Sequence, residues 1–153
     1  MLIMDVQEQI IARLPYSEPF LFVDKLIHID DNSVKGIYHL RPDLDFYKGH
    51  FKYQPVTPGV ILLEIMAQIG LVCLGLHLTG NTQEPEKFPF ALSSSEVEFL
   101  KPVYPDETVT VVSEKVYFRF GKLKCKVSML NAQGETVCEG TISGILMKHH
   151  DRA

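Results

Sequence analysis

The sequence of 153 residues contains few cysteines and no excess of basic residues, and both shortages narrow the possible functions. Cys73, Cys125 and Cys138 lie far apart, without a CxxC pair or the Cys/His spacing of a metal site. A disulfide framework and a zinc site are therefore not expected, and buried thiols are the better interpretation. With 15 Lys and Arg against 19 Asp and Glu, the net charge of −4 gives no reason to expect nucleic-acid binding.

The chain also lacks internal repeats, low-complexity tracts, linkers and a secretory signal pattern. Its start, MLIMDVQEQI, contains acids and has no basic segment followed by an apolar stretch. We therefore expect a cytoplasmic protein. The length suits one domain over residues 1–153, and 46% hydrophobic with 22% charged residues is an ordinary globular composition.

One apolar run is long enough to require a membrane test. Residues 60–78 read VILLEIMAQIGLVCLGLHL, which is close to the length that spans a bilayer. Glu64, Gln68 and His77 lie within this run, and an ionisable group at membrane depth is costly. We therefore expect a helix buried inside the protein and no membrane span.

The segments around this run predict a sheet that wraps the helix. Thr57 suits the N-cap of the helix and Pro58 its first position. A helix that is apolar on all sides needs cover on all sides, which one antiparallel sheet can supply. The predicted fold class is α+β, with a short helix over 5–14, a loop at 81–87, and strands at 20–29, 33–40, 95–100, 107–120, 122–130 and 136–147.

The stretch 49–68, GHFKYQPVTPGVILLEIMAQ, gathers three features that suit proton transfer. His50 lies in a loop, and histidine has the pKa best suited to a general base near neutrality. Gly59 lies at the helix start, where unpaired N–H groups can stabilise a developing oxyanion. Glu64 lies inside the apolar helix, where burial favours a protonated general acid. Together they can break a C–H and a C–O bond beside a thioester.

Each feature alone also has an ordinary structural explanation. A loop histidine is usually a surface or structural residue, and Pro-Gly at a helix start usually forms a cap. Glu64 is followed one turn later by Gln68, and the two side chains could simply satisfy each other in a core.

The same stretch resembles the active-site signature of the 3-hydroxyacyl-acyl carrier protein dehydratases, a family with the hot dog fold. In that family a long helix lies in a wrapped antiparallel sheet. Glu at position 64, rather than Asp, resembles the branch that only dehydrates. The matching segments are Gly49-His50-Phe51, Pro58-Gly59 and Glu64 to Gln68, with further matches at 14–15, 19–25 and 99–103, so that nearly the whole chain is covered.

The resemblance implies a reaction, a site and an assembly. His50 would remove the α proton, Glu64 would protonate the departing β-hydroxyl, and the Gly59 N–H would hold the thioester oxygen. The product would be a trans-2-enoyl thioester of fatty acid or related polyene biosynthesis, carried on acyl carrier protein or coenzyme A. No cofactor and no metal are expected. The implied assembly is a homodimer or a trimer of dimers, in which His50 and Glu64 of one site come from different subunits.

The resemblance also implies where the acyl chain and the carrier would bind. The predicted tunnel lining comprises Phe51, Val60, Ile61, Gln68, Phe90 and Ala91, with Phe90 at the far end. The carrier is acidic, so lysines are its candidate contacts. They are Lys122, Lys124 and Lys126, or Lys48 and Lys52, although a solvated strand face explains the first three equally well.

The chain departs from the family pattern at three places, and two other functions stay open. Residues 52–55 read Lys-Tyr-Gln-Pro where Pro-Gly-Asn-Pro is frequent, and residues 16–17 read Tyr-Ser where His-Arg is usual. Ser93, Ser95 and Glu96 stand where a Gly, an Asp and a basic residue are frequent. One alternative is a hot dog acyl-CoA thioesterase that uses a helix carboxylate as base. The other is a catalytically silent subunit of a heteromeric dehydratase.

Overall fold

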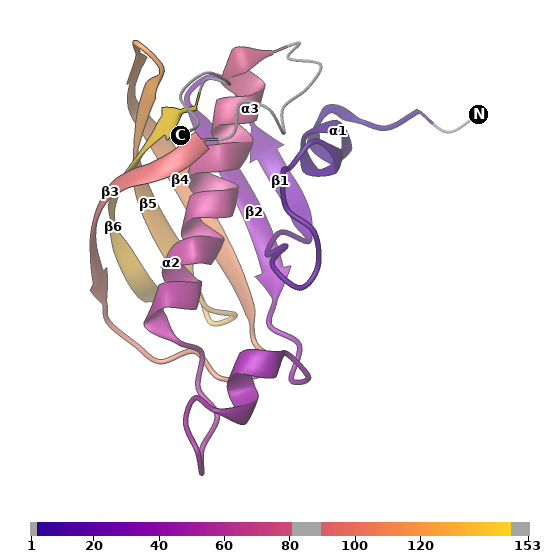
Figure 1. Ribbon diagram of the computed structural model, residues 1–153, viewed down its shortest axis with the longest axis vertical. Coiled ribbons are helices and arrows are strands. Elements are labelled where there is room, and N and C mark those ends of the chain that lie inside the picture. Colours follow the sequence, from indigo (N-terminus) through magenta and orange to yellow (C-terminus); the bar gives the residue numbers. More distant parts are fainter. Residues whose placement is uncertain (1–2, 81–89, 148–153) are drawn as a thin grey trace.

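One antiparallel sheet and one long helix make up most of the structure. The computed structural model describes residues 3–80 and 90–147, so the loop predicted at 81–87 lies outside the described residues. Six strands are hydrogen-bonded in the order β1-β2-β4-β5-β6-β3, and the central helix lies against one face of this sheet (Figure 1). The predicted fold class is confirmed. The strands are β1 (Lys25–Ile29), β2 (Ser33–His39), β3 (Phe90–Phe99), β4 (Thr108–Arg119), β5 (Lys122–Leu130) and β6 (Thr136–Leu146).

The central helix runs from Gly59 to Thr79 in three consecutive segments. These are α2 (Gly59–Ala67), a π-helical segment η2 (Gln68–Cys73) and α3 (Leu74–Thr79). The helix is long and apolar enough to cross a membrane, yet 72% of its most apolar 18-residue window is buried inside the protein. That burial fits a core helix, as the polar residues within the run predicted.

The sheet covers the helix through alternating apolar side chains. On β5, Leu123, Cys125, Val127 and Met129 are fully buried, in the alternation that the sequence predicted. All three cysteines are free and buried. Burial raises the pKa of the Cys125 thiol to about 11 and that of Cys138 to about 12, which keeps both thiols protonated and unreactive.

Two smaller helices flank this core. Helix α1 (Val6–Ala12) is capped by Asp5, whose side chain accepts a hydrogen bond from the N–H of Glu8. The 3-10 helix η1 (Asp45–Lys48) precedes the loop that leads into α2. The predicted N-terminal helix is therefore confirmed, with slightly narrower bounds.

Two predicted strand boundaries are wrong. The first strand begins at Lys25 and not at Phe20, because the backbone at Phe20 and Phe22 bonds to a side chain of the central helix instead of a neighbouring strand. Strand β3 begins at Phe90 and not at residue 95. Most of its side chains are exposed, so no alternation marked it, and its pairing with β6 defines it instead.

The predicted N-cap at Thr57 is also wrong. Pro58 occupies the N-cap position, without a side-chain hydrogen bond to the helix. The hydroxyl of Thr57 instead lies 2.6 Å from the phenol oxygen of Tyr47. The helix start is therefore left without a capping side chain.

Strands β3 and β6 approach each other so closely that a glycine is required. A Cβ atom on Gly140 would lie 1.9 Å from the backbone oxygen of Glu96. Backbone cannot move aside as the end of a flexible side chain can. The absence of a side chain at position 140 therefore allows the edge strand β3 to join the sheet.

We predict that Gly140→Ala lowers the free energy of unfolding by about 3 kcal/mol, the upper range for overpacking in a well-packed site. Urea unfolding followed by circular dichroism measures this change. Gly49→Ala is the control, because a Cβ there meets nothing within 4 Å and the backbone φ is −119°. Equal stability of the two variants would contradict the prediction.

Candidate active site

His50 lies in the segment between η1 and α2, which projects from the lower end of the molecule (Figure 1). Its ring Nδ1 lies 2.9 Å from the carbonyl oxygen of Val56. Because a carbonyl oxygen only accepts, Nδ1 donates this hydrogen bond and carries the ring proton. The N–H of Val56 in turn donates to the backbone oxygen of His50 at 2.9 Å. In the neutral ring Nε2 therefore keeps its lone pair, as a general base requires.

The start of the central helix offers an open backbone donor beside a small hollow. Among the described residues, a hollow of about 250 Å³ at this helix start is lined by Thr57, Gly59, Leu62, Phe99, Leu100, Lys101 and Pro102. A Cβ on Gly59 would lie 3.5 Å from the Phe99 ring, an ordinary contact distance. Packing alone therefore does not require glycine here. The missing side chain instead leaves room for a ligand carbonyl to approach the first N–H groups of the helix.

Glu64 lies one turn further along and is held by a buried amide. The Nε2 group of Gln68 donates to Glu64 Oε2 at 3.0 Å, so the predicted Glu64–Gln68 contact is confirmed. The same Nε2 group donates to the backbone oxygen of Phe20 at 3.0 Å, and Gln68 Oε1 accepts from the N–H of Phe22 at 2.8 Å. These three bonds fix the orientation of the Gln68 amide, which is fully buried.

Burial raises the pKa of Glu64, and the hydrogen bond from Gln68 opposes that shift only in part. Both Nε2 hydrogens of Gln68 are used, one of them on Glu64 Oε2. When Glu64 is protonated, its proton therefore resides on Oε1, because Oε2 already faces a donor. A protonated Glu64 would therefore present its O–H group from one defined oxygen.

Tyr16 is a residue of this site that the motif did not point to. It is half-buried, and burial followed by the charge of Glu64 raises its pKa. Its ring lies 6.4 Å from that of Phe20, whose backbone oxygen is bonded to Gln68. The signal in the sequence was the departure at residues 16–17, where the family usually has His-Arg.

The other predicted site residues are distributed over the molecule. Phe51 stacks on the His50 ring with centroids 4.0 Å apart, whereas Val60 is 72% exposed. Phe90 is buried at the other end of the central helix, where it packs beside the Phe118 ring, and Ala91 after it is exposed. Ile61 is half-buried. Within the described residues no hydrogen bond joins His50 to Glu64, since each is bonded to a neighbour in its own segment.

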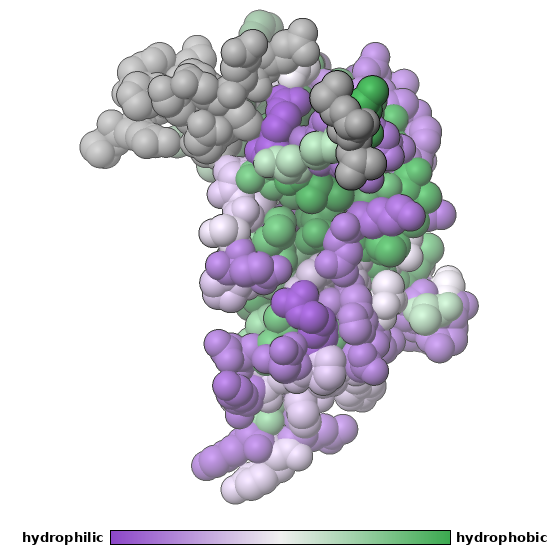
Figure 2. Space-filling view, turned by 90° about the vertical axis from the view of Figure 1, so that its right-hand side faces the viewer, coloured by the Kyte–Doolittle hydropathy of each residue, from purple (hydrophilic) through white to green (hydrophobic). Residues whose placement is uncertain are grey.

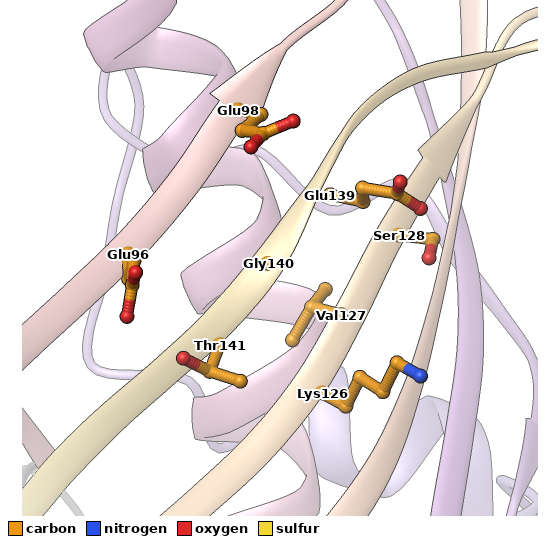
Figure 3. A pocket seen from close by; sticks show the side chains of 8 residues that line it. All are labelled: Glu96, Glu98, Lys126, Val127, Ser128, Glu139, Gly140 and Thr141. Carbon is orange, nitrogen blue, oxygen red and sulfur yellow. The ribbon is translucent and has the colours of Figure 1, made fainter.

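A second hollow, of about 340 Å³, lies on the face of the sheet that points away from the central helix (Figure 3). Its walls carry Glu96 and Glu98 from β3 and Glu139 from β6, with Lys126 from β5. Glu98 and Glu139 are direct cross-strand partners, and two like charges in that position repel each other. This acidic hollow is separated by the sheet from the helix that bears Glu64 and lacks the features of an anion site.

The raised pKa of Glu64 predicts a pH-dependent stability. The folded protein holds this proton more tightly than the unfolded chain, whose carboxyl has the ordinary value of 4.5. The contribution of Glu64 is therefore fully present below pH 4.5 and is lost as the pH rises through the folded-state pKa.

We predict that Glu64→Gln, which cannot ionise, is more stable than the parent at pH 8, and that the difference disappears as the pH falls toward 4.5. Urea unfolding of both proteins at several pH values between these limits measures it. A difference that does not change with pH would show that Glu64 is not destabilised by burial of its charge.

The antiparallel sheet packed on one long helix is a hot dog fold that carries a candidate base, His50, and a candidate acid, Glu64, and comparison with known proteins identifies its family. Residues 14–143 match the family model of the FabA-like domain. The 3-hydroxyacyl-[acyl-carrier-protein] dehydratase FabZ of Caldicellulosiruptor bescii is 34% identical over 138 residues, which cover 88% of this chain and 94% of that protein. FabZ of Thermus thermophilus is 33% identical over 143 residues, covering 94% and 97%. The chain belongs to the FabA-like family, as its motifs predicted.

Solved structures share this fold at lower sequence identity. The dehydratase heterocomplex ApeI:P from Xenorhabdus doucetiae has a TM-score of 0.75 and 15% identity, covering 97% of this chain and 95% of that one. A hypothetical thioesterase from Streptococcus pneumoniae, solved with coenzyme A, has a TM-score of 0.61 and 17% identity, covering 80% and 84%. Both likenesses concern the fold alone.

Proposed function

We propose that this protein is a 3-hydroxyacyl-[acyl carrier protein] dehydratase that forms trans-2-enoyl thioesters in fatty acid or related polyene biosynthesis. The observation that carries the proposal is a complementary acid and base in one motif. His50 keeps the lone pair of Nε2 because its Nδ1 proton is bonded to Val56, while burial favours the protonated form of Glu64. The family membership and the dehydratase activity named for its FabZ relatives agree with this chemistry.

In the proposed mechanism the thioester carbonyl binds at the N–H of Gly59, in the hollow at the start of α2. His50 Nε2 takes the α proton, and the charge that develops on the thioester oxygen is stabilised by the helix start. Glu64 Oε1 gives its proton to the β-hydroxyl, the C–O bond breaks, and water leaves. Transfer of the proton from His50 back to Glu64 through water restores both groups. The acyl tail runs along the central helix toward Phe90.

His50 and Glu64 of one site come from different copies of the chain in this proposal. The segment after His50 projects from the body and exposes Phe51 by 61% and Tyr53 by 92%, which suits a segment that packs on another chain. Strand β3 leaves an open edge, and apolar Phe99, its last residue, is 50% exposed. A second copy paired along β3 would cover these surfaces.

A second exposed surface, formed by β1 and α1, could join such dimers into larger assemblies. Strand β1 forms the other open edge of the sheet. On the side that carries α1 and β1, apolar side chains gather over the upper half while the lower half is polar (Figure 2). Val6 of α1 and Ile27 of β1 are 54% and 47% exposed. This surface supports a trimer of dimers as the larger assembly.

We predict that His50→Ala and Glu64→Gln each lower kcat by about 10²-fold or more, the usual scale for removal of a general acid or base. Enoyl formation from a 3-hydroxyacyl thioester is the assay, with circular dichroism to confirm folding. Near-normal activity of either variant would overturn the mechanism.

The two inactive variants also test the shared site. When they are co-expressed at equal levels, about half of the dimers are mixed, and each mixed dimer has one intact site of two, so about a quarter of the parent activity should return. If both residues of a site come from one chain, mixing restores no activity.

An acidic carrier protein would dock on the basic half of the outer sheet face. Lys122 and Lys124 occupy alternate positions of β5 with their side chains on that face, and Lys126, the next in this alternation, lies at the border with the acidic hollow that it also lines. Beside them Arg119 lies 4.3 Å from the centre of the Tyr117 ring. The other half carries the acidic hollow and would repel the carrier (Figure 3).

We predict that Lys122→Glu with Lys124→Glu raises KM for the carrier-linked substrate about tenfold and leaves KM for a coenzyme A or pantetheine thioester unchanged, as expected for rim charges of an interface. Lys48→Glu with Lys52→Glu is the matched variant beside the active-site loop. If only that second variant weakens binding of the carrier, docking occurs at the loop instead of on β5.

The likeness to a thioesterase structure keeps one alternative testable. A hot dog thioesterase would release a free thiol, whereas the dehydratase leaves the thioester intact and forms an enoyl group. The likeness to a dehydratase heterocomplex keeps the silent-subunit alternative testable as well, since the purified protein alone would then be inactive.

A further inference from the structure

A buried hydrogen bond joins the two ends of the segment that contains His50. The phenol oxygen of Tyr47 lies 2.6 Å from Oγ1 of Thr57. Tyr47 is 5% exposed and Thr57 is 4% exposed. Tyr47 belongs to η1, three residues before His50, and Thr57 lies two residues before Gly59. The bond therefore connects the residues that lead into the base with those that lead into the oxyanion donor.

This bond also anchors the segment to the body of the protein. The backbone N–H of Thr57 donates to the carbonyl oxygen of Val103 at 2.8 Å, and Val103 is fully buried. The ring of Tyr47 belongs to the apolar core. We call the bonded pair of Tyr47 and Thr57 the neck of the segment. Beyond the neck, residues 51–55 are exposed and project from the molecule (Figure 1). The neck is therefore the place where the position of the projecting segment is set.

Packing alone does not explain why two polar side chains, those of Tyr47 and Thr57, occupy this buried position. A buried hydroxyl that lacks a partner is destabilising, whereas replacing both partners by apolar groups of the same shape is nearly neutral. Phenylalanine at position 47 and valine at position 57 would occupy almost the same volume. What the polar pair adds is direction, because a hydrogen bond of this length allows little change in distance or angle.

The bond persists over the whole range of pH in which a histidine base works. Burial raises the pKa of Tyr47, and its hydrogen bond to Thr57 opposes that shift. The phenol therefore keeps its proton and can always donate or accept in this pair. The neck does not loosen when His50 changes its charge during a catalytic cycle.

We propose that Tyr47 and Thr57 are positioning residues, whose hydrogen bond sets the placement of the His50 ring relative to the N–H of Gly59. The inference rests on the proposed function for its kinetic consequence, although the placement of His50 is a property of the structure. The bond of His50 Nδ1 to Val56 orients the ring within the loop. The Tyr47–Thr57 bond, which joins the residue three before His50 to the residue directly after Val56, orients the loop relative to the helix start.

Tyr47→Phe and Thr57→Val test the proposal together with their double variant. Each single variant should lower kcat about tenfold with little change in KM, since a small misplacement of a reacting group is costly while binding of the acyl tail is untouched. The double variant should be no worse than either single variant, because both remove the same bond. Thr57→Ser, which keeps the hydroxyl, should retain most of the parent kcat.

Tyr38 supplies a matched control. It is also a buried tyrosine, 1% exposed, but its phenol oxygen has no hydrogen-bond partner among residues 3–80 and 90–147. Tyr38→Phe should therefore leave kcat unchanged. A loss of kcat in this variant as large as in Tyr47→Phe would show that removal of any buried phenol impairs the enzyme, and would overturn the proposal.

A spectroscopic measurement separates this inference from the proposed reaction. The ¹⁵N shifts of the His50 ring report whether Nδ1 alone carries the proton. The parent should show this single tautomer. Tyr47→Phe and Thr57→Val should show a mixture, because Val56, whose carbonyl oxygen accepts from Nδ1, directly precedes Thr57 and shifts when the bond of Thr57 to Tyr47 is lost. An inactive parent with these shifts would sink the dehydratase proposal and support the positioning role. Unchanged shifts and unchanged kcat in both variants, or additive losses in the double variant, would overturn the positioning role.

Discussion

The need to cover a helix that is apolar all round governs this structure. Helix Gly59–Thr79 carries apolar side chains on all of its faces, so exposure of any face to water is unfavourable. Strands that precede and follow the helix in the sequence therefore pack around it. The requirement extends to small details. Gly140 lets the edge strand approach its neighbour, and Ser113 donates to the carbonyl oxygen of Gly70 at 2.8 Å inside the π-helical segment. One sheet covers one side, and surfaces left open, such as the exposed side chain of Phe99, are assigned above to a second copy.

Placing an acid on this helix creates a second constraint, which Gln68 satisfies. A carboxyl group in an apolar environment needs a partner, and a fully buried amide needs several. Gln68 meets both needs by bonding Glu64 on its own helix and the backbone of Phe20 and Phe22 from the N-terminal segment. This explains why the segment before β1 is not part of the sheet. The backbone groups of Phe20 and Phe22 bond to the Gln68 side chain, so these β-forming residues do not pair with a neighbouring strand.

The same competition between local preference and tertiary partners explains the other wrong predictions. Thr57 has the side chain of an N-cap, but Tyr47 offers its hydroxyl a partner at 2.6 Å and Pro58 takes the cap position. Beyond the buried Phe90, strand β3 lacks alternation because both of its faces are exposed at the edge of the sheet. Neither outcome could be predicted from residue spacing, since both depend on partners distant in the chain or in a neighbouring strand.

The sequence by itself determined the α+β class, the buried central helix, the alternation on β5, the contact between Glu64 and Gln68 and the family. All of these follow from periodicity, composition or a motif of short span, which local geometry converts directly into position. Only the tertiary structure decided which nitrogen of His50 is free, which oxygen of Glu64 faces the Gln68 amide, and which side chains Tyr16 and Tyr47 lie beside. Those properties arise because hydrogen-bond partners such as Val56, Phe20 and Thr57 are selected by the folded chain, where burial leaves each polar group few alternatives.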